Sequence, residues 1–266
     1  MSATFDTEGF MRDGYTVLKS AALEAVKAAA EAEMLETGRH IARRIVGRAE
    51  GDTLGDLLAF LLREETDQAA TRACYEVFPT LPGVLALINA PVFLDAAREA
   101  GLARPVAGTC PLVRLDRPAD TRFSTPAHQD WWYSMLSKRA VVIWTGIGAL
   151  SEDMGPVQLV AGSHADGLAE FKRYEAGHEW FECAAPAPDA RFQPALPGAD
   201  EAVVFDQRVI HRSGVNRSDR VRVSIQLRYN DLETAAAMTT TFTPSLSRWV
   251  LARQDEHLEA GARRAG

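Results

Sequence analysis

The residues with the clearest chemical potential lie in the segment STPAHQDWWYS, residues 124–134, where one glutamine separates His128 from Asp130. Residues i and i+2 of a strand point to the same side. A strand here would therefore aim an imidazole and a carboxylate at one point and turn Gln129 away. This pair is either two thirds of a metal site or a polar patch beside core aromatic residues. Since two ligands hold a metal poorly, a third ligand elsewhere in the chain must decide.

His211 is the best candidate for that third ligand. It follows the apolar run EAVVFDQRVI and precedes the turn-rich RSGVNRSD, which predicts a strand end bordering the interior of a β fold. Two histidines and one carboxylate leave coordination positions open, and this suits non-haem iron(II) oxygen chemistry. A structural zinc site would prefer four ligands that include thiolates. The remaining histidines fall in helical, tail, loop or turn segments: His40, His164, His178 and His257.

The elements that must position these ligands are predicted strands, which begin after about residue 105. Short β-branched or aromatic runs bounded by Gly, Pro, Asp or Ser indicate strands in AGTCPLVRLD, RAVVIWTGIGAL, GPVQLVAGSH, EAVVFDQRVIH and DRVRVSIQLRYND. The last run alternates strictly and so has two different environments. One face carries Val221, Val223, Ile225, Leu227 and Tyr229; the other carries Arg220, Arg222, Ser224, Gln226 and Arg228.

The preceding part of the chain is predicted to be helical. Ser20 is a suitable N-cap for an alanine- and glutamate-rich segment, and Asn89 and Pro91 open a helix that Gly101 can close. A stripe at helical spacing marks a third helix: Leu54, Leu57, Leu58, Leu61 and Leu62. Helices followed by many short strands predict a mainly β fold with flanking α, in which a jelly-roll carries the helices outside. We expect a single domain over 1–266: 1–104 mostly helical, 105–245 the β core, and 246–266 a C-terminal tail or helix.

Composition restricts the partners. The chain has 29 Lys and Arg against 36 Asp and Glu, a formal charge of −7, so nucleic acid and anionic membranes are poor partner candidates. No window has the apolar length of a membrane span, and the N-terminus lacks the pattern of a signal peptide. Three dispersed cysteines, Cys74, Cys110 and Cys183, are interpreted as reduced thiols. We expect a cytoplasmic monomer or small homo-oligomer.

Four segments together resemble the phytanoyl-CoA dioxygenase family of iron(II)- and 2-oxoglutarate-dependent oxygenases. They are FDTEGFMRDGYTVLKS, then HQD with its following aromatics, then VVIWTGIGALSEDMGPVQLVAGSHADG, and last HRSGVNRSDRVRVSIQLRY. The order is that of the family, and the segments span most of the chain. One departure occurs at a turn, where Ala161 stands in place of the family's usual proline.

The resemblance implies a double-stranded β-helix, or cupin-like jelly-roll, and a set of site residues. His128, Asp130 and His211 would bind iron(II). The cosubstrate 2-oxoglutarate would contact Arg222, Ser213 and Trp144. Arg222 lies eleven positions after His211, and its planar guanidinium offers the bidentate fork that a carboxylate prefers.

Two further residues are candidates for contacts with the substrate. Strand alternation would put Trp132 on the side of His128 and Asp130. Arg114 lies on the strand that precedes the triplet, where it could meet a substrate or cosubstrate carboxylate.

The expected reaction consumes 2-oxoglutarate and O2, releases succinate and CO2, and hydroxylates an unactivated carbon of a small metabolite or natural product. Asp130 argues against halogenation, because the resemblance implies a small residue at that position in halogenating relatives. Epoxidation, desaturation and ring formation at the same iron centre stay open. The alternatives from other classes are a non-catalytic cupin-type binding protein and a zinc or manganese cupin isomerase.

Overall fold

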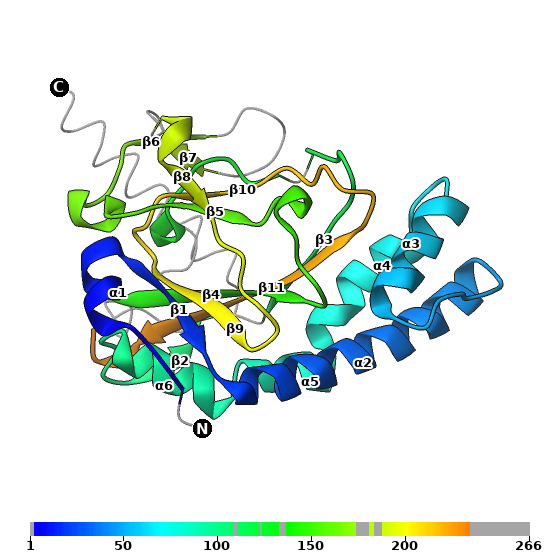
Figure 1. Cartoon of the computed structure of the whole chain (residues 1–266), viewed down its shortest axis with the longest axis horizontal. Coiled ribbons are helices and arrows are strands. Elements are labelled where there is room, and N and C mark those ends of the chain that lie inside the picture. Colours follow the sequence, from blue (N-terminus) through cyan, green and yellow to red (C-terminus); the bar gives the residue numbers. More distant parts are fainter. Residues whose placement is uncertain are drawn as a thin grey trace, which may run out of the picture.

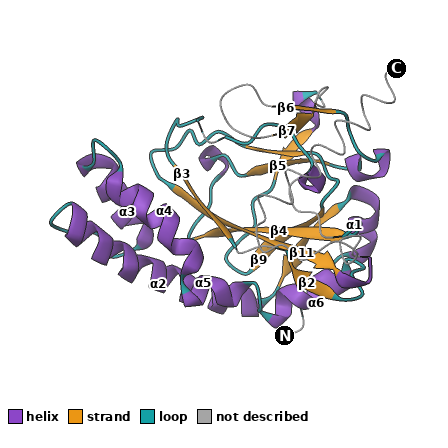
Figure 2. Cartoon of the chain, turned by 180° about the vertical axis from the view of Figure 1, so that it is seen from behind, coloured by secondary structure: helices purple, strands orange, loops and turns teal. Residues whose placement is uncertain are grey.

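The computed structural model describes residues 3–108, 111–122, 124–132, 137–173, 181–183 and 188–234. Two antiparallel sheets face each other, and helices cover the outer face of the larger one (Figure 1). The same layers are visible from behind (Figure 2). The predicted jelly-roll with helices packed outside is confirmed.

The α-helices of the described residues lie in the N-terminal part of the chain, as predicted. Ser20 accepts a hydrogen bond from the Ala22 N–H at 3.3 Å and caps the long second helix. Pro91 opens α6, and the Gly101 backbone follows its end with φ of +95°. The α-helices are α1 (Thr7–Asp13), α2 (Ala21–Ile45), α3 (Leu54–Glu64), α4 (Ala69–Val77), α5 (Pro82–Leu87) and α6 (Pro91–Glu99). The 3-10 helices are η1 (Phe78–Thr80), η2 (Asp130–Trp132), η3 (Glu152–Met154), η4 (Ser163–Asp166), η5 (Asp189–Arg191) and η6 (Leu232–Thr234).

The larger sheet is centred on its longest strand, β11 (Arg222–Asp231). One side of β11 pairs with β4 (Ala140–Ile147), which leads on to β9 (Glu201–Asp206) and β1 (Tyr15–Lys19). The other side pairs with β3 (Leu112–Asp116) near its start and with β2 (Pro105–Ala107) at its end. Thus the first residue of β11 lies opposite the last residue of β3, and this pairing places Arg222 beside Asp116.

The smaller sheet has the order β10 (His211–Ser213), β5 (Val157–Val160) and β8 (Phe192–Pro194). A separate two-stranded sheet joins β6 (Phe171–Arg173) to β7 (Phe181–Cys183). The prediction of one strand over EAVVFDQRVIH is wrong, because β9 and β10 belong to different sheets. Asp206 accepts hydrogen bonds from the backbone N–H and from the guanidinium of Arg208. These bonds stabilise the turn that joins β9 to β10. Apolar residues flank this short polar turn on both sides, residues 203–205 before it and 209–210 after it, so the sequence pattern did not reveal the change of sheet.

The core lies on both faces of the larger sheet, and β4 is therefore buried at all eight of its residues. Val141 and Ile143 pack toward the helices, whereas Val142 and Trp144 pack between the two sheets. The hydroxyl of buried Tyr229 donates to the Ile88 carbonyl at 2.8 Å and links β11 to the helical layer.

Strand β1 lies in the part of the chain that was predicted as helical, and its full pairing with β9 is a correction to that prediction. Its five residues stand between two helices, so local composition concealed them. The predicted C-terminal tail, with all residues after 234, lies outside the described ranges. In the described residues no single helix is long and apolar enough to span a membrane; the pair Ala69–Thr80 and Pro82–Glu99, bent by 44°, meets the criteria only jointly.

Candidate metal centre and cosubstrate site

The two histidines predicted to bind metal lie directly opposite each other. His128 and His211 form an isolated antiparallel bridge, in which each backbone N–H donates to the other residue's carbonyl at 2.9 Å. Because His211 is the first residue of β10, the bridge sets His128 at the edge of the smaller sheet. Their rings are 4.1 Å apart between centroids. The fold thus brings together two residues that are far apart in the sequence.

Asp130 completes the cluster, although not through the strand geometry that we expected. It begins the 3-10 helix η2, so the prediction of a strand through the triplet is wrong. Its Oδ1 nevertheless lies 3.4 Å from His128 Nε2 and 3.9 Å from His211 Nε2, and all three residues are buried. The three donor atoms lie within 4.8 Å of one another. Gln129 points away, and its amide binds the carbonyls of Gly167 and Arg208.

The hydrogen bonds of the imidazoles prepare both rings for metal binding. Nδ1 of His128 donates to the Pro126 carbonyl at 2.8 Å, and Nδ1 of His211 donates to the Val209 carbonyl at 2.9 Å. A carbonyl only accepts, so the proton belongs on Nδ1 and the lone pair of Nε2 is left for a metal. Burial, reinforced by the neighbouring His128, lowers the pKa of His211 to about 3 and keeps the ring in its neutral, ligating form.

Two side chains of β11 hold the carboxylate of Asp130 from the other side. Gln226 Nε2 donates to Asp130 Oδ2 at 2.9 Å, and Arg228 donates through Nε to Oδ2 at 3.1 Å and through Nη2 to Oδ1 at 3.3 Å. Burial alone would raise the pKa of Asp130, but Arg228 and the two histidines outweigh it and lower the pKa. The sequence placed Gln226 and Arg228 on the polar face of their strand, but nothing in it indicated that both side chains would bind Asp130.

Arg222, the predicted cosubstrate ligand, is buried at the start of β11 with an exposed fraction of 2%. Its Nη1 donates to the Met154 carbonyl at 3.0 Å and its Nη2 to Asp116 Oδ2 at 2.7 Å. Nearby, Ser213 Oγ accepts the Thr125 N–H at 3.2 Å. The structure therefore places Arg222 on the inner face of its strand, as the alternation predicted.

Arg114 joins the same charge cluster through Asp116. Its Nη2 and Nε donate to the two oxygens of Asp116 at 2.6 and 3.1 Å, and its Nη1 donates to Thr125 Oγ1 at 3.2 Å. Burial would raise the pKa of Asp116, but Arg114 and Arg222 lower it, so this residue is a carboxylate. Two arginines and one aspartate leave one positive charge in a nearly buried place. A monovalent carboxylate is the group that would neutralise it.

The two predicted tryptophan contacts have different outcomes. Trp144 is 5% exposed and packs between the sheets in the cluster that includes Phe205. The rings of Phe205 and His211 are packed edge-on, with their centroids 4.8 Å apart. Its contact with a cosubstrate stays a prediction. The reason given for Trp132 does not hold, because alternation does not apply in a 3-10 helix, and the Trp132 side chain lies outside the described residues.

The chemistry of these residues fits iron(II) and a 2-oxoglutarate-type anion. Two imidazole nitrogens and one carboxylate on one side form the facial set that non-haem iron(II) sites use. Three buried polar atoms of β10 and β11 have no hydrogen-bond partner within the described residues: His211 Nε2, Arg222 Nε and Ser224 Oγ. Ser224 alternates between Arg222 and Gln226 and so shares their inner face. Unpartnered buried polar atoms in one interior indicate a place for a polar ligand.

Solved structures with a similar fold include proteins described as non-haem enzymes. ThoJ, described as a non-heme monooxygenase, superposes with a TM-score of 0.59 at 18% identity, over 85% of this chain and 77% of that one. EctD from S. alaskensis, solved with 2-oxoglutarate and 5-hydroxyectoine, gives 0.52 at 16%, over 86% and 76%. The α-ketoglutarate-dependent epimerase SnoN from nogalamycin biosynthesis gives 0.52 at 16%, over 90% and 88%. At these identities the likeness establishes the shared fold.

The sequence itself matches one family model. No curated protein sequence matches the chain. The model of the phytanoyl-CoA dioxygenase (PhyH) family matches residues 10–224, which include every ligand candidate and Arg222. The chain therefore belongs to the phytanoyl-CoA dioxygenase family of non-haem iron(II)- and 2-oxoglutarate-dependent oxygenases.

Proposed function

We propose that His128, Asp130 and His211 hold the catalytic iron and that the enzyme hydroxylates an unactivated carbon of a small metabolite or natural product. The observation that carries the proposal is the convergence of three buried donor atoms, with both Nδ1 atoms bound to backbone carbonyls. Two Nε2 atoms that face one buried carboxylate, while both Nδ1 atoms are held by backbone carbonyls, form the donor set of a metal site and not that of a structural histidine pair.

The residues of the chain prepare the site in three ways. The backbone bridge holds His128 and His211 opposite each other, and the hydrogen bonds of their Nδ1 atoms orient the two rings. Arg228 and Gln226 keep Asp130 ionised and oriented, so that one oxygen can ligate the metal. When bound, iron(II) with 2-oxoglutarate supplies the O2-dependent oxidation of a C–H bond, with succinate and CO2 as co-products.

Arg222 and Ser213 receive the carboxylate of 2-oxoglutarate that lies away from the metal. Arg222 is anchored on two sides, by Met154 and by Asp116, and this leaves its Nε without a partner. Such anchoring lowers the entropy that the side chain loses when the cosubstrate binds. The net positive charge of Arg114, Asp116 and Arg222 adds an attraction that a single carboxylate satisfies.

Hydroxylation is favoured by the complete ligand set. Asp130 occupies the carboxylate position, so all three protein ligands are present, as an oxygen-transferring centre requires. Among proteins of similar fold, ThoJ is described as a monooxygenase, and EctD was solved with a hydroxylated compound. Identification of the product distinguishes hydroxylation from epimerisation, the activity named for SnoN.

The proposal is tested with His211→Ala and the control His40→Ala, which changes an exposed histidine of α2. Iron(II) and 2-oxoglutarate added under argon should give a weak visible charge-transfer band with the wild type and with His40→Ala, but not with His211→Ala. In air, a screen of small molecules should then find compounds that stimulate succinate release by the same two proteins. Mass spectrometry with labelled O2 should detect one added oxygen atom in the product. Wild-type protein with neither band nor succinate would contradict the proposal.

A further inference from the structure

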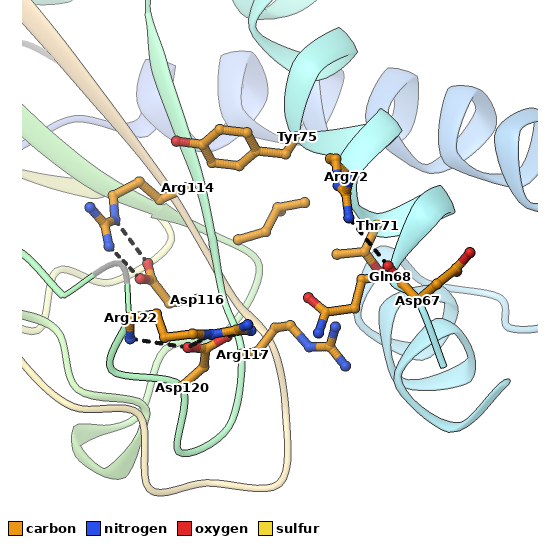
Figure 3. A pocket seen from close by; sticks show the side chains of 11 residues that line it. Asp67, Gln68, Thr71, Arg72, Tyr75, Arg114, Asp116, Arg117, Asp120 and Arg122 are labelled. Carbon is orange, nitrogen blue, oxygen red and sulfur yellow. Dashed lines mark hydrogen bonds and ion pairs between the residues drawn. The ribbon is translucent and has the colours of Figure 1, made fainter. Parts of the chain in front are cut away.

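A cavity of about 500 Å³ lies on the other side of the charge cluster, between the start of α4, strand β3 and the loop after β3 (Figure 3). Its volume is that of a small-molecule site. Thr71 and Tyr75 of α4 form one wall, and Leu115 and Asp116 of β3 form the other. Since Asp116 also pairs with Arg222, this cavity and the expected cosubstrate site share a wall.

The charges that line the cavity favour a monovalent anion. Four arginines and three aspartates leave one net positive charge: Arg72, Arg114, Arg117 and Arg122 against Asp67, Asp116 and Asp120. Two of these aspartates are already committed to arginines. Asp116 binds Arg114 through both oxygens, and Asp120 binds Arg122 at 2.6 and 2.9 Å.

This pairing leaves two arginines, Arg72 and Arg117. Arg72 donates to the backbone carbonyl of Asp67 at 3.3 Å, so Arg117 is the one with an unsatisfied buried donor. Its Nη1 is buried and has no hydrogen-bond partner, and Arg117 forms no ion pair with any described residue. Figure 3 shows its side chain extending from the loop toward Gln68 at the opposite wall. A buried guanidinium N–H without an acceptor is costly, and a ligand carboxylate would satisfy it.

The remaining walls suit an apolar or ring-bearing body. Tyr75 is 44% exposed, and its ring borders the cavity (Figure 3), which Leu115 also lines. Gln68, which directly precedes α4 on the wall that holds Tyr75, has a φ of +61°, a left-handed conformation that costs a residue other than glycine roughly 1 kcal/mol or more. Backbone strain of this kind is frequent at ligand sites.

We propose that this cavity is a binding site for a small-molecule carboxylate with an apolar or ring-bearing body, held by a charge-assisted hydrogen bond from Arg117. The site goes beyond the proposed oxygenase function, because none of the residues that carry it is a predicted metal ligand. A single negative charge matches the lining better than a phosphate dianion, which would reverse the net charge.

The test is calorimetric titration of benzoate into the full chain loaded with iron(II) under argon. Benzoate should bind to the wild type and bind on the order of ten-fold or more weakly to Arg117→Gln. The matched control is Arg122→Gln, which removes the same charge from the same cavity but from an arginine that is already paired. It should retain most of the affinity. Benzyl alcohol, the neutral analogue, and inorganic phosphate should bind more weakly than benzoate.

Three outcomes would overturn the proposal: equal weakening by the two variants, benzoate binding that Arg117→Gln leaves unchanged, or equal binding of benzyl alcohol. The first outcome would show that benzoate responds only to the total positive charge around the cavity. The second would place the benzoate elsewhere, for example at Arg222. Because His211→Ala should bind benzoate as the wild type does, failure of this site and failure of the iron site are distinguishable. Far-UV circular dichroism verifies that Arg117→Gln is folded.

Discussion

Asp130 illustrates how a ligand depends on residues that never touch the metal. Its carboxylate is completely buried, and a buried anion is stable only when it is paired and hydrogen-bonded. Arg228 and Gln226 provide both conditions from β11. Residues that hydrogen-bond to a metal ligand can affect metal affinity strongly, although they do not touch the metal.

We predict that Arg228→Gln lowers iron(II) affinity by about 10- to 100-fold, because Asp130 loses the cation that keeps it ionised and oriented. The measurement is titration with iron(II) under argon, followed by the charge-transfer band with 2-oxoglutarate. Arg228→Lys should restore part of the affinity, since it restores the charge without the fork.

The matched control for this prediction is Arg220→Gln, an exposed arginine close to the start of the same strand, which should bind iron as the wild type does. Unchanged iron affinity in folded Arg228→Gln would show that Arg228 has no positioning role.

At the scale of elements, strand β11 connects the helical layer on one face of the larger sheet with the candidate metal site on the other face. Its outer face packs Val223, Ile225 and Leu227 against the helical side, and its inner face presents Arg222, Gln226 and Arg228 to the site. Because the period of a strand is two residues, a register shift of one would exchange these faces. Stability and site geometry therefore depend on the same register.

The contact between α2 and the sheet includes a buried cation, Lys27. It is 6% exposed and donates to the carbonyls of Gly198 at 2.9 Å and Glu201 at 3.2 Å. Burial lowers the pKa of Lys27 to about 8, although nearby carboxylates such as Asp200 partly oppose this. The amine of the unfolded chain keeps a pKa near 10.4.

We predict that the unfolding free energy rises with pH between about 8 and 10.4, relative to Lys27→Met. In this window the native state has released the Lys27 proton while the unfolded state still binds it. Linkage then adds at most about 1.4 kcal/mol per pH unit. Urea unfolding of both proteins across this range measures the difference, and parallel curves would contradict it.

At the scale of the whole molecule, one hydrophobic cluster runs from the helices into the larger sheet. It contains Leu57 of α3, Phe78 after α4 and Phe93 of α6 together with Ile143 and Ile225 of the sheet. Neither layer could bury its apolar face alone. The expected single domain stays a prediction, and this shared core supports it.

We therefore predict that the N-terminal helices and the jelly-roll unfold in one transition. Far-UV circular dichroism follows mainly the N-terminal helices, and tryptophan fluorescence follows the jelly-roll, where Trp144 is buried. The two urea transitions should coincide. Loss of helical signal at a lower urea concentration than the fluorescence change would indicate a separate helical unit.

The agreement between expectation and structure was closest where the physical signal is local. The leucine stripe of α3 and the alternation of β11 each depend on a period that neighbouring residues reveal. Strand β1 and the change of sheet between β9 and β10 escaped prediction because they depend on which segments pair. Residue type does not encode that choice locally.

The sequence by itself identified the ligand candidates His128, Asp130 and His211, because their residue types suit a metal and the segments around them resemble one family in the right order. Only the tertiary structure decided the partners of the arginines. Arg222 and Arg228 share one strand face, yet Arg222 meets Asp116 at a separation of 106 residues and Arg228 meets Asp130 at 98. A strand's period says which side chains face inward; what lies opposite depends on sheet pairing and loop paths, which join residues across the whole chain.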